Sequence, residues 1–164
     1  MAEPHIVPLG ARHTRSLAEC HIDCWREAYA DLVPGHVLDA FDVEHRAELW
    51  ERIRVRHPDA TRVALLDDTV IGFVSTGHTR DEPPVADREL LALYVRSPWY
   101  GTGLADELLE TALVPAASYS LWVFDENPRA RAFYRRHGFA DDGGRKREDF
   151  SPALLVRMVR PARS

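Results

Sequence analysis

An apolar strand that leads through a glycine turn into a helix lies near the middle of the sequence. Residues 89–95 form a nearly continuous apolar run, which is typical of a strand covered on both faces. Gly101 and Gly103 follow this run, and helical periodicity begins near Gly103. Glycines let a backbone approach an anion closely, and the first amides of a helix have no partner within the helix. The unit predicts a turn that binds phosphate or pyrophosphate, with an ordinary strand–turn–helix connection as the alternative.

Two common nucleotide-binding patterns are disfavoured at this turn. The dinucleotide fingerprint needs a third glycine or alanine at the position where this chain has Asp106. The phosphate loop of nucleoside triphosphatases needs four residues between its glycines and then Lys followed by Ser or Thr, which this chain lacks.

A second patterned segment runs from Asn127 to Phe139. Asn127-Pro128 is typical of a helix start, and Gly138 is typical of a helix end. Asn127 and Tyr134 are seven residues apart, about 700° of helical rotation, so they lie on one face of this helix. The alternative is that Asn127 only caps the helix and that Tyr134 only packs in the core.

The rest of the chain predicts alternating strands and helices. Strands are expected at 5–9, 62–66, 70–74 and 119–124, with two more beginning at 139 and spanning 153–159. Helices are expected around 17–28 and 37–53, and a polar stretch over 141–149 separates the last two strands. This βααβββαβαββ order predicts a single α/β (α+β) domain over residues 1–164. We expect a mixed central sheet of six to seven strands flanked by about four helices.

Composition narrows the class of protein. The net charge of −5 argues against a nucleic-acid partner, and no apolar run reaches the roughly 18–20 residues of a membrane span. The N-terminus shows no secretory pattern, and the two cysteines, Cys20 and Cys24, suit reduced thiols, so we expect a cytoplasmic protein. The eight histidines form no pair with metal-ligand spacing, so no metal is expected.

Together the two segments resemble the GNAT N-acetyltransferase superfamily. Tyr100-x-x-Gly103-x-Ala105 is similar to its coenzyme A signature Gln/Arg-x-x-Gly-x-Gly/Ala, with Tyr100 as the departure. Asn-x-x-Ala-x-x-Phe-Tyr-x-x-x-Gly-Phe, beginning at Asn127, is similar to its following motif. The resemblance implies acetyl-CoA as cosubstrate and an amine of a small molecule or protein as acceptor. The cosubstrate-binding residues that it implies are Leu93, Tyr94, Val95, Gly101, Thr102, Gly103, Leu104, Ala105, Asp106 and Asn127.

The resemblance also implies catalytic roles. Tyr134 corresponds to a general acid that protonates the departing thiolate, and Glu89 is the candidate base, with a solvated glutamate as the alternative. Residues 89, 91, 93 and 95 are expected to share one strand face, so Glu89 would lie on the same face as Leu93 and Val95. Trp25 and Tyr29 are candidate substrate residues. An acyl-CoA sensor without turnover and a protein-interaction domain stay open as alternatives, as does a homodimer.

Overall fold

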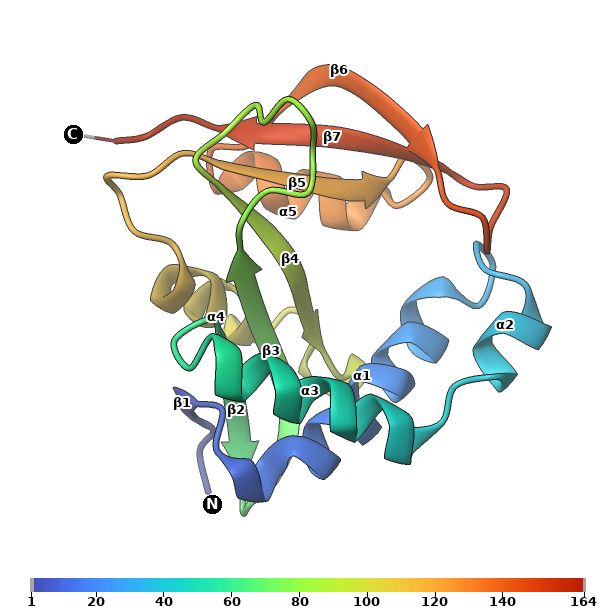
Figure 1. Ribbon diagram of the computed structural model, residues 1–164, viewed down its shortest axis with the longest axis vertical. Coiled ribbons are helices and arrows are strands. Elements are labelled where there is room, and N and C mark those ends of the chain that lie inside the picture. The colour runs from blue at the N-terminus through green and yellow to red at the C-terminus, as the bar shows by residue number, and fades with distance from the viewer. Residues whose placement is uncertain (1, 164) are drawn as a thin grey trace.

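A computed structural model describes residues 2–163, which fold around one seven-stranded mixed sheet (Figure 1). The strand order is β1-β2-β3-β4-β5-β7-β6, and only β4 and β5 pair in parallel. The strands are β1 (His5–Pro8), β2 (Thr61–Leu66), β3 (Thr69–Gly77), β4 (Arg88–Val95), β5 (Tyr119–Phe124), β6 (Ala140–Arg147) and β7 (Leu154–Arg160). The α-helices are α1 (Thr14–Tyr29), α2 (Gly35–Asp39), α3 (Val43–Arg56), α4 (Leu104–Ala112) and α5 (Pro128–Arg136), with short 3-10 turns at Ala11–His13 and Ser97–Trp99.

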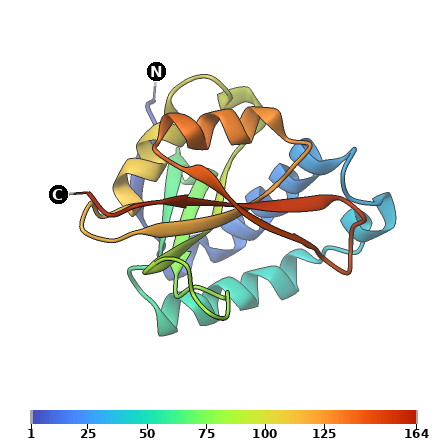
Figure 2. The ribbon, with the colours of Figure 1, turned by 90° about the horizontal axis from the view of Figure 1, so that it is seen from above.

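The helices cover both faces of the sheet. Helices α1 and α3 pack on one face, where Leu17, Trp50 and Phe73 belong to one buried cluster. Helices α4 and α5 share a second cluster on the other face, which contains Leu108 and Tyr119. Figure 2 shows this layering, with α5 and α3 on opposite sides of the sheet. The apolar run of β4 therefore has helices on both of its faces, as the sequence predicts, although Leu91 is partly exposed.

Strands β4 and β5 are paired at one end only. Their ladder consists of Arg88 opposite Tyr119 and Glu89 opposite Ser120. Beyond these pairs β4 stays paired with β3 up to Val95, and β5 stays paired with β7. Figure 1 shows β4 running away from β5 beyond the shared end. The backbone of β4 from Leu90 to Val95, about 17 Å long at the usual rise per residue, thus lacks a strand partner on its β5 side.

A β-bulge in β4 interrupts the alternation of side chains that the sequence predicts. Ser75 pairs with Ala92 and Thr76 pairs with Leu90, so Leu91 is the extra residue. Leu90 consequently packs in the same cluster as Leu93 and Val95. The expectation that residues 89, 91, 93 and 95 share one face was wrong, because the bulge shifts the two-residue period.

Two further boundaries differ from the sequence-based expectation. The helix expected around 37–53 is interrupted, because Asp42 begins α3 as its N-cap and its carboxylate accepts a hydrogen bond from the amide of Glu44. The polar stretch expected to separate the last two strands is largely β6 itself. Its side chains are mostly exposed and its only strand neighbour is β7, so β6 is an edge strand on which apolar alternation is not required.

Candidate functional site

A cavity of about 680 Å³ occupies the space where β4 and β5 separate. Its walls come from the unpaired side of β4, from β5, from the turn before α4 and from α5. The predicted residues Leu93, Tyr94, Val95, Gly101, Gly103, Ala105, Asp106 and Asn127 all line it. Thr102 and Leu104 do not: the Thr102 hydroxyl bonds the carbonyl of Trp99, and Leu104 is buried in the core. The structure thus brings both sequence motifs to one cavity.

The glycine turn is built on two left-handed residues. Gly101 has φ +75° and Gly103, the N-cap of α4, has φ +91°. An ideal Cβ at either glycine would meet no atom within 4 Å. Internal packing therefore does not require glycine at these two positions. The left-handed backbone and the open space together leave the amides at the start of α4 approachable, as an anion-binding turn requires.

Asn127 connects the cap of α5 to the cavity. Its Oδ1 accepts a hydrogen bond from the amide of Ala130 at 3.2 Å, so the capping role is confirmed. It also lines the cavity, so capping does not remove it from the site. The other end of α5 contacts the first turn of α4, because His137 lies 2.7 Å from the Asp106 carboxylate. These contacts fix α5 against the start of α4.

Tyr134 lies in the wall of the cavity on the α5 side. Burial raises the pKa of Tyr134, so its phenol keeps its proton at neutral pH. Its ring packs edge-on against Phe139, with centroids 5.8 Å apart. A protonated phenol facing the cavity has the chemistry that a proton donor needs.

Glu89 lies at the paired end of β4 and lines neither this cavity nor the second one described below. Its side chain is fully buried and accepts hydrogen bonds from the amide and guanidinium of Arg80 at 2.6–3.1 Å. The carboxylate therefore holds the 78–87 connection against β4. The role of base stays a prediction.

Trp25 and Tyr29, the candidate substrate residues, both line the cavity. Tyr29 is hydrogen-bonded to Tyr94 through their hydroxyls, 3.0 Å apart, and Trp25 packs edge-on against Tyr29. Burial raises the pKa of both tyrosines, so this pair stays neutral. The pair joins the end of α1 to β4 at the inner edge of the cavity.

The sequence analysis did not identify Arg129, which lies beside Tyr100, the residue that differs from the coenzyme A signature. The Arg129 guanidinium lies 3.5 Å from the centroid of the Tyr100 ring, and both residues line the cavity. A guanidinium on an aromatic face is a favourable cation–π arrangement. The signal was present, since Arg129 follows Asn127 by two residues, but only the fold places it beside Tyr100.

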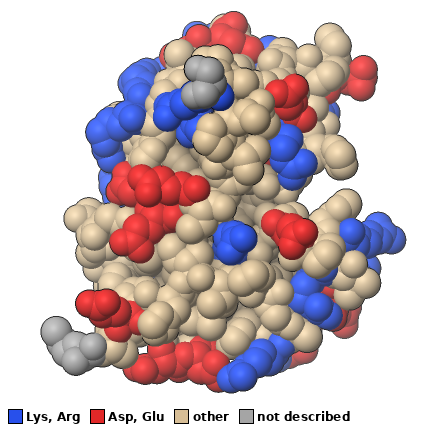
Figure 3. All heavy atoms as spheres, turned by 90° about the vertical axis from the view of Figure 1, so that its left-hand side faces the viewer, with Lys and Arg blue, Asp and Glu red and all other residues tan. Residues whose placement is uncertain are grey.

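Surface charge, metal-ligating groups and helix composition point to no further site. On the side shown in Figure 3, acidic and basic side chains are interspersed rather than gathered by sign. Among residues 2–163 no group of His, Cys, Asp and Glu side chains is arranged to hold a metal ion. No helix in the same range has both the length and the apolar composition to span a bilayer.

Comparison with known proteins agrees with this geometry. Residues 16–139 match the model of the acetyltransferase (GNAT) family, so the chain belongs to that family. It is 27% identical over 122 residues to the uncharacterized N-acetyltransferase YuaI of Bacillus subtilis, covering 70% of this chain and 68% of the relative. It is also 27% identical over 137 residues to Rv2775 of Mycobacterium tuberculosis, named a probable N-acetyltransferase, covering 77% of this chain and 74% of the relative.

Solved structures share the fold. A PaiA N-acetyltransferase from Thermoplasma acidophilum, in complex with coenzyme A, superposes with a TM-score of 0.68 at 19% identity, covering 97% of this chain and 99% of that one. A structure described as histone acetyltransferase HPA2 and related acetyltransferase, from Corynebacterium glutamicum, gives a TM-score of 0.72 at 17% identity, covering 100% of this chain and 98% of that one. The expected fold, a GNAT-like domain with a mixed sheet, is confirmed.

Proposed function

We propose that the protein transfers the acetyl group of acetyl-CoA directly to a primary amine. The observation that carries the proposal is the cavity between β4 and β5, which joins an open strand edge, a left-handed glycine turn and a buried phenol. The family membership and the coenzyme A complex of the Thermoplasma relative support the choice of cosubstrate.

The cavity fits an elongated ligand that carries phosphates at one end. The unpaired backbone of Leu93 and Val95 offers hydrogen-bonding groups to an extended amide chain, as an added strand would use. The amides around Gly101 and Gly103 suit the pyrophosphate. Asn127 suits the pantetheine arm, and Arg129 supplies a cation beside Tyr100, where the motif usually has Gln or Arg. Acetyl-CoA supplies an acetyl thioester at the inner end of this cavity.

The transfer requires an unprotonated amine and a proton for the leaving sulfur. The amine nitrogen uses its lone pair to form a bond to the acetyl carbonyl carbon, the carbon–sulfur bond breaks, and the sulfur departs with the electron pair. Tyr134 gives its phenolic proton to that sulfur, and the surplus proton of the amine nitrogen passes to a base or to water. Glu89 is the base that the sequence suggests, but its burial against Arg80 favours a structural role.

Direct transfer is favoured over an acyl-enzyme route. No cysteine or serine of the described residues lines the cavity, so the usual hydroxyl or thiol nucleophiles are missing from its walls. An acyl-CoA sensor without turnover is the alternative on the same fold. The position of Tyr134 in the cavity wall supports turnover over binding alone, because a phenol there can donate a proton to the leaving sulfur.

The test of the proposal is Tyr134→Phe, which keeps the ring and removes the proton. Turnover with acetyl-CoA and an amine acceptor found in an amine screen should fall about 10²–10⁴-fold, while the affinity for coenzyme A changes little. Tyr119→Phe is the matched control, since the Tyr119 hydroxyl accepts a hydrogen bond from the Val114 amide and lines neither cavity. It should lose stability but keep its turnover. Full activity of Tyr134→Phe would remove the general-acid role.

A further inference from the structure

A second cavity, of about 1060 Å³, lies on the α1/α3 side of β4. It shares five wall residues with the first cavity: Trp25, Leu91, Ala92, Tyr94 and Phe150. Leu91, the bulged residue of β4, is 38% exposed and contributes to both walls. The two cavities therefore meet across β4 where its side-chain alternation is broken.

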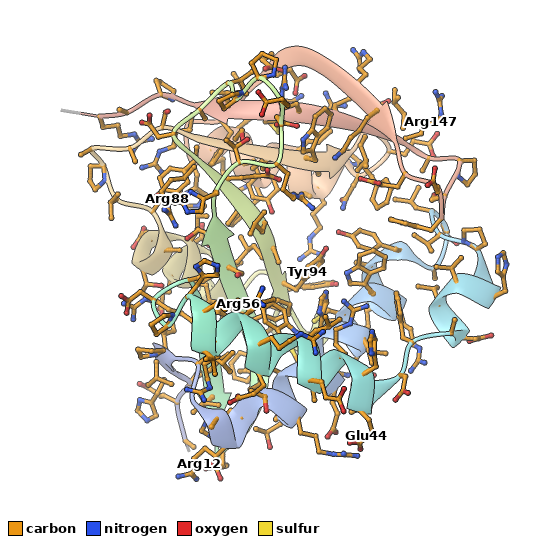
Figure 4. The ribbon with its side chains drawn as sticks, viewed as in Figure 1. Arg12, Glu44, Arg56, Arg88, Tyr94 and Arg147 are labelled. Atoms are coloured by element: carbon orange, nitrogen blue, oxygen red, sulfur yellow. The ribbon has the colours of Figure 1, made fainter. Side chains whose placement is uncertain are left out.

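The walls of the second cavity combine apolar rings with arginines. Aromatic side chains form much of its surface, from Trp25, Phe41, Trp50 and Phe150. Arg46, Arg56 and Arg88 also line it, against a single lining carboxylate, Asp59, in the part of the chain described. In Figure 4, Arg56 lies on the α3 side of this space and Arg88 on the side of the upper strands. A chain of net charge −5 thus gathers three cations around one apolar cavity.

These arginines lack acidic partners. Outside this cavity, Arg12, Arg54 and Arg96 are each bonded to a carboxylate. None of the three cavity arginines forms an ion pair with a carboxylate of residues 2–163. Arg46 is partly buried and lies over the ring of Phe41, 5.3 Å from its centroid. A partly buried guanidinium without a carboxylate is costly, and an anionic ligand would offset that cost.

We propose that the second cavity binds the acceptor, and that this acceptor is an apolar amino acid: a primary amine that also carries a carboxylate and an apolar side chain. This inference rests on the proposed acetyl transfer. The aromatic walls would hold the side chain, the partly buried Arg46 would hold the carboxylate, and the amine would face the first cavity past Leu91 and Tyr94. Specificity of this kind comes from a few charged groups placed around an apolar pocket.

The experiment compares L-phenylalanine with phenethylamine, which has the same ring and amine but no carboxylate. Calorimetry measures the binding of each probe to the full chain, with and without saturating coenzyme A, and coenzyme A binding is measured first. L-phenylalanine should bind at least about tenfold more tightly, because a bidentate arginine–carboxylate contact is a strong charge-assisted hydrogen bond. Acetylation of each probe by acetyl-CoA is then followed by mass spectrometry, and L-phenylalanine should again be preferred.

Arginine variants identify the carboxylate site. Arg46→Gln, which removes the partly buried guanidinium over Phe41, should weaken L-phenylalanine about tenfold and change phenethylamine less than about twofold. Arg52→Gln is the matched control, an exposed arginine of α3 that lines neither cavity, and should change neither probe.

Four results would separate the acceptor assignment from the proposed acetyl transfer. Equal binding of the two probes, or no binding of L-phenylalanine beside normal coenzyme A binding, would overturn the acceptor assignment alone. Loss of L-phenylalanine binding in Arg52→Gln to the same extent would do so as well. Failure of the wild-type chain to bind coenzyme A would instead overturn the proposed acetyl transfer.

Discussion

Gly103→Val tests the glycine turn most directly, because the structure provides a matched glycine elsewhere. Gly103 and Gly143 both have φ +91°, and at both positions an added Cβ would meet no atom within 4 Å. Gly143 lies in β6 and lines neither cavity. A side chain forced into the left-handed region costs on the order of 1–2 kcal/mol at either site. Both variants should therefore melt about 2–8 °C below the wild type.

Only the variant in the turn should lose the ligand. At a coenzyme A concentration 100 times the dissociation constant, binding stabilises the folded wild type by about 2.7 kcal/mol. A hundredfold loss of affinity in Gly103→Val would reduce this to about 0.4 kcal/mol, a shift of about 1 °C. Gly143→Val should keep the full ligand-induced shift, about 5–11 °C.

The assay is thermal unfolding of the three proteins with and without coenzyme A, with calorimetry for the dissociation constants. Equal ligand-induced shifts in the two variants would show that the turn is only a connection between β4 and α4. A loss of stability in Gly103→Val much larger than that in Gly143→Val would show that a side chain at position 103 disturbs the fold itself and not only the ligand site.

Three further predictions concern Asn127, His21 and Glu89. Asn127→Ala should cost about 0.5–2 kcal/mol of stability by denaturant unfolding while Asn127→Ser keeps the cap, and both should weaken coenzyme A if the side chain contacts the pantetheine arm. Burial lowers the pKa of His21 to about 3, so the unfolded chain binds more protons between pH 6.5 and 3. Stability should fall as the pH falls through that window, by up to about 1.4 kcal/mol per pH unit, and His21→Phe should flatten the profile measured by denaturant unfolding. Glu89→Gln should cost about 1–3 kcal/mol, because it weakens the contacts with Arg80, and should leave the pH–rate profile unchanged. Loss of the acidic limb of that profile would instead support Glu89 as the base.

The parts of the fold that could be predicted are those whose signals are local. Asn127-Pro128 begins α5 and Gly138, with φ +91°, follows its end, because capping and left-handed termination depend on adjacent residues. The apolar run of β4 and the turn at Gly103 were predicted for the same reason. Asp42 was also a local signal for the start of α3, but the flanking apolar residues suggested one continuous helix.

The parts that could not be predicted depend on pairing between distant segments. The bulge at Leu91 is defined by the register of β4 against β3, which no pattern within residues 88–95 reveals. The second cavity takes Arg46 from α3 and Arg88 from β4, so no spacing in the sequence connects them. The ion pair between Glu89 and Arg80 could not be predicted either, since Arg80 lies in a polar connection whose sequence is typical of a surface loop.

The incomplete pairing of β4 has a consequence for the solubility of the protein. An unpaired strand edge can template the addition of another chain, and most proteins protect their edges with charges, prolines or covering loops. Here the apolar edge from Leu90 to Val95 lies in the interior of a cleft whose opposite wall is β5 and α5 of the same chain. A strand of another folded sheet carries its own neighbours and cannot enter such a space, whereas a single slender chain can. The cleft thus leaves the strand edge accessible to a slender, extended ligand. It also keeps that edge from pairing with a strand of another protein molecule, which would lead to aggregation.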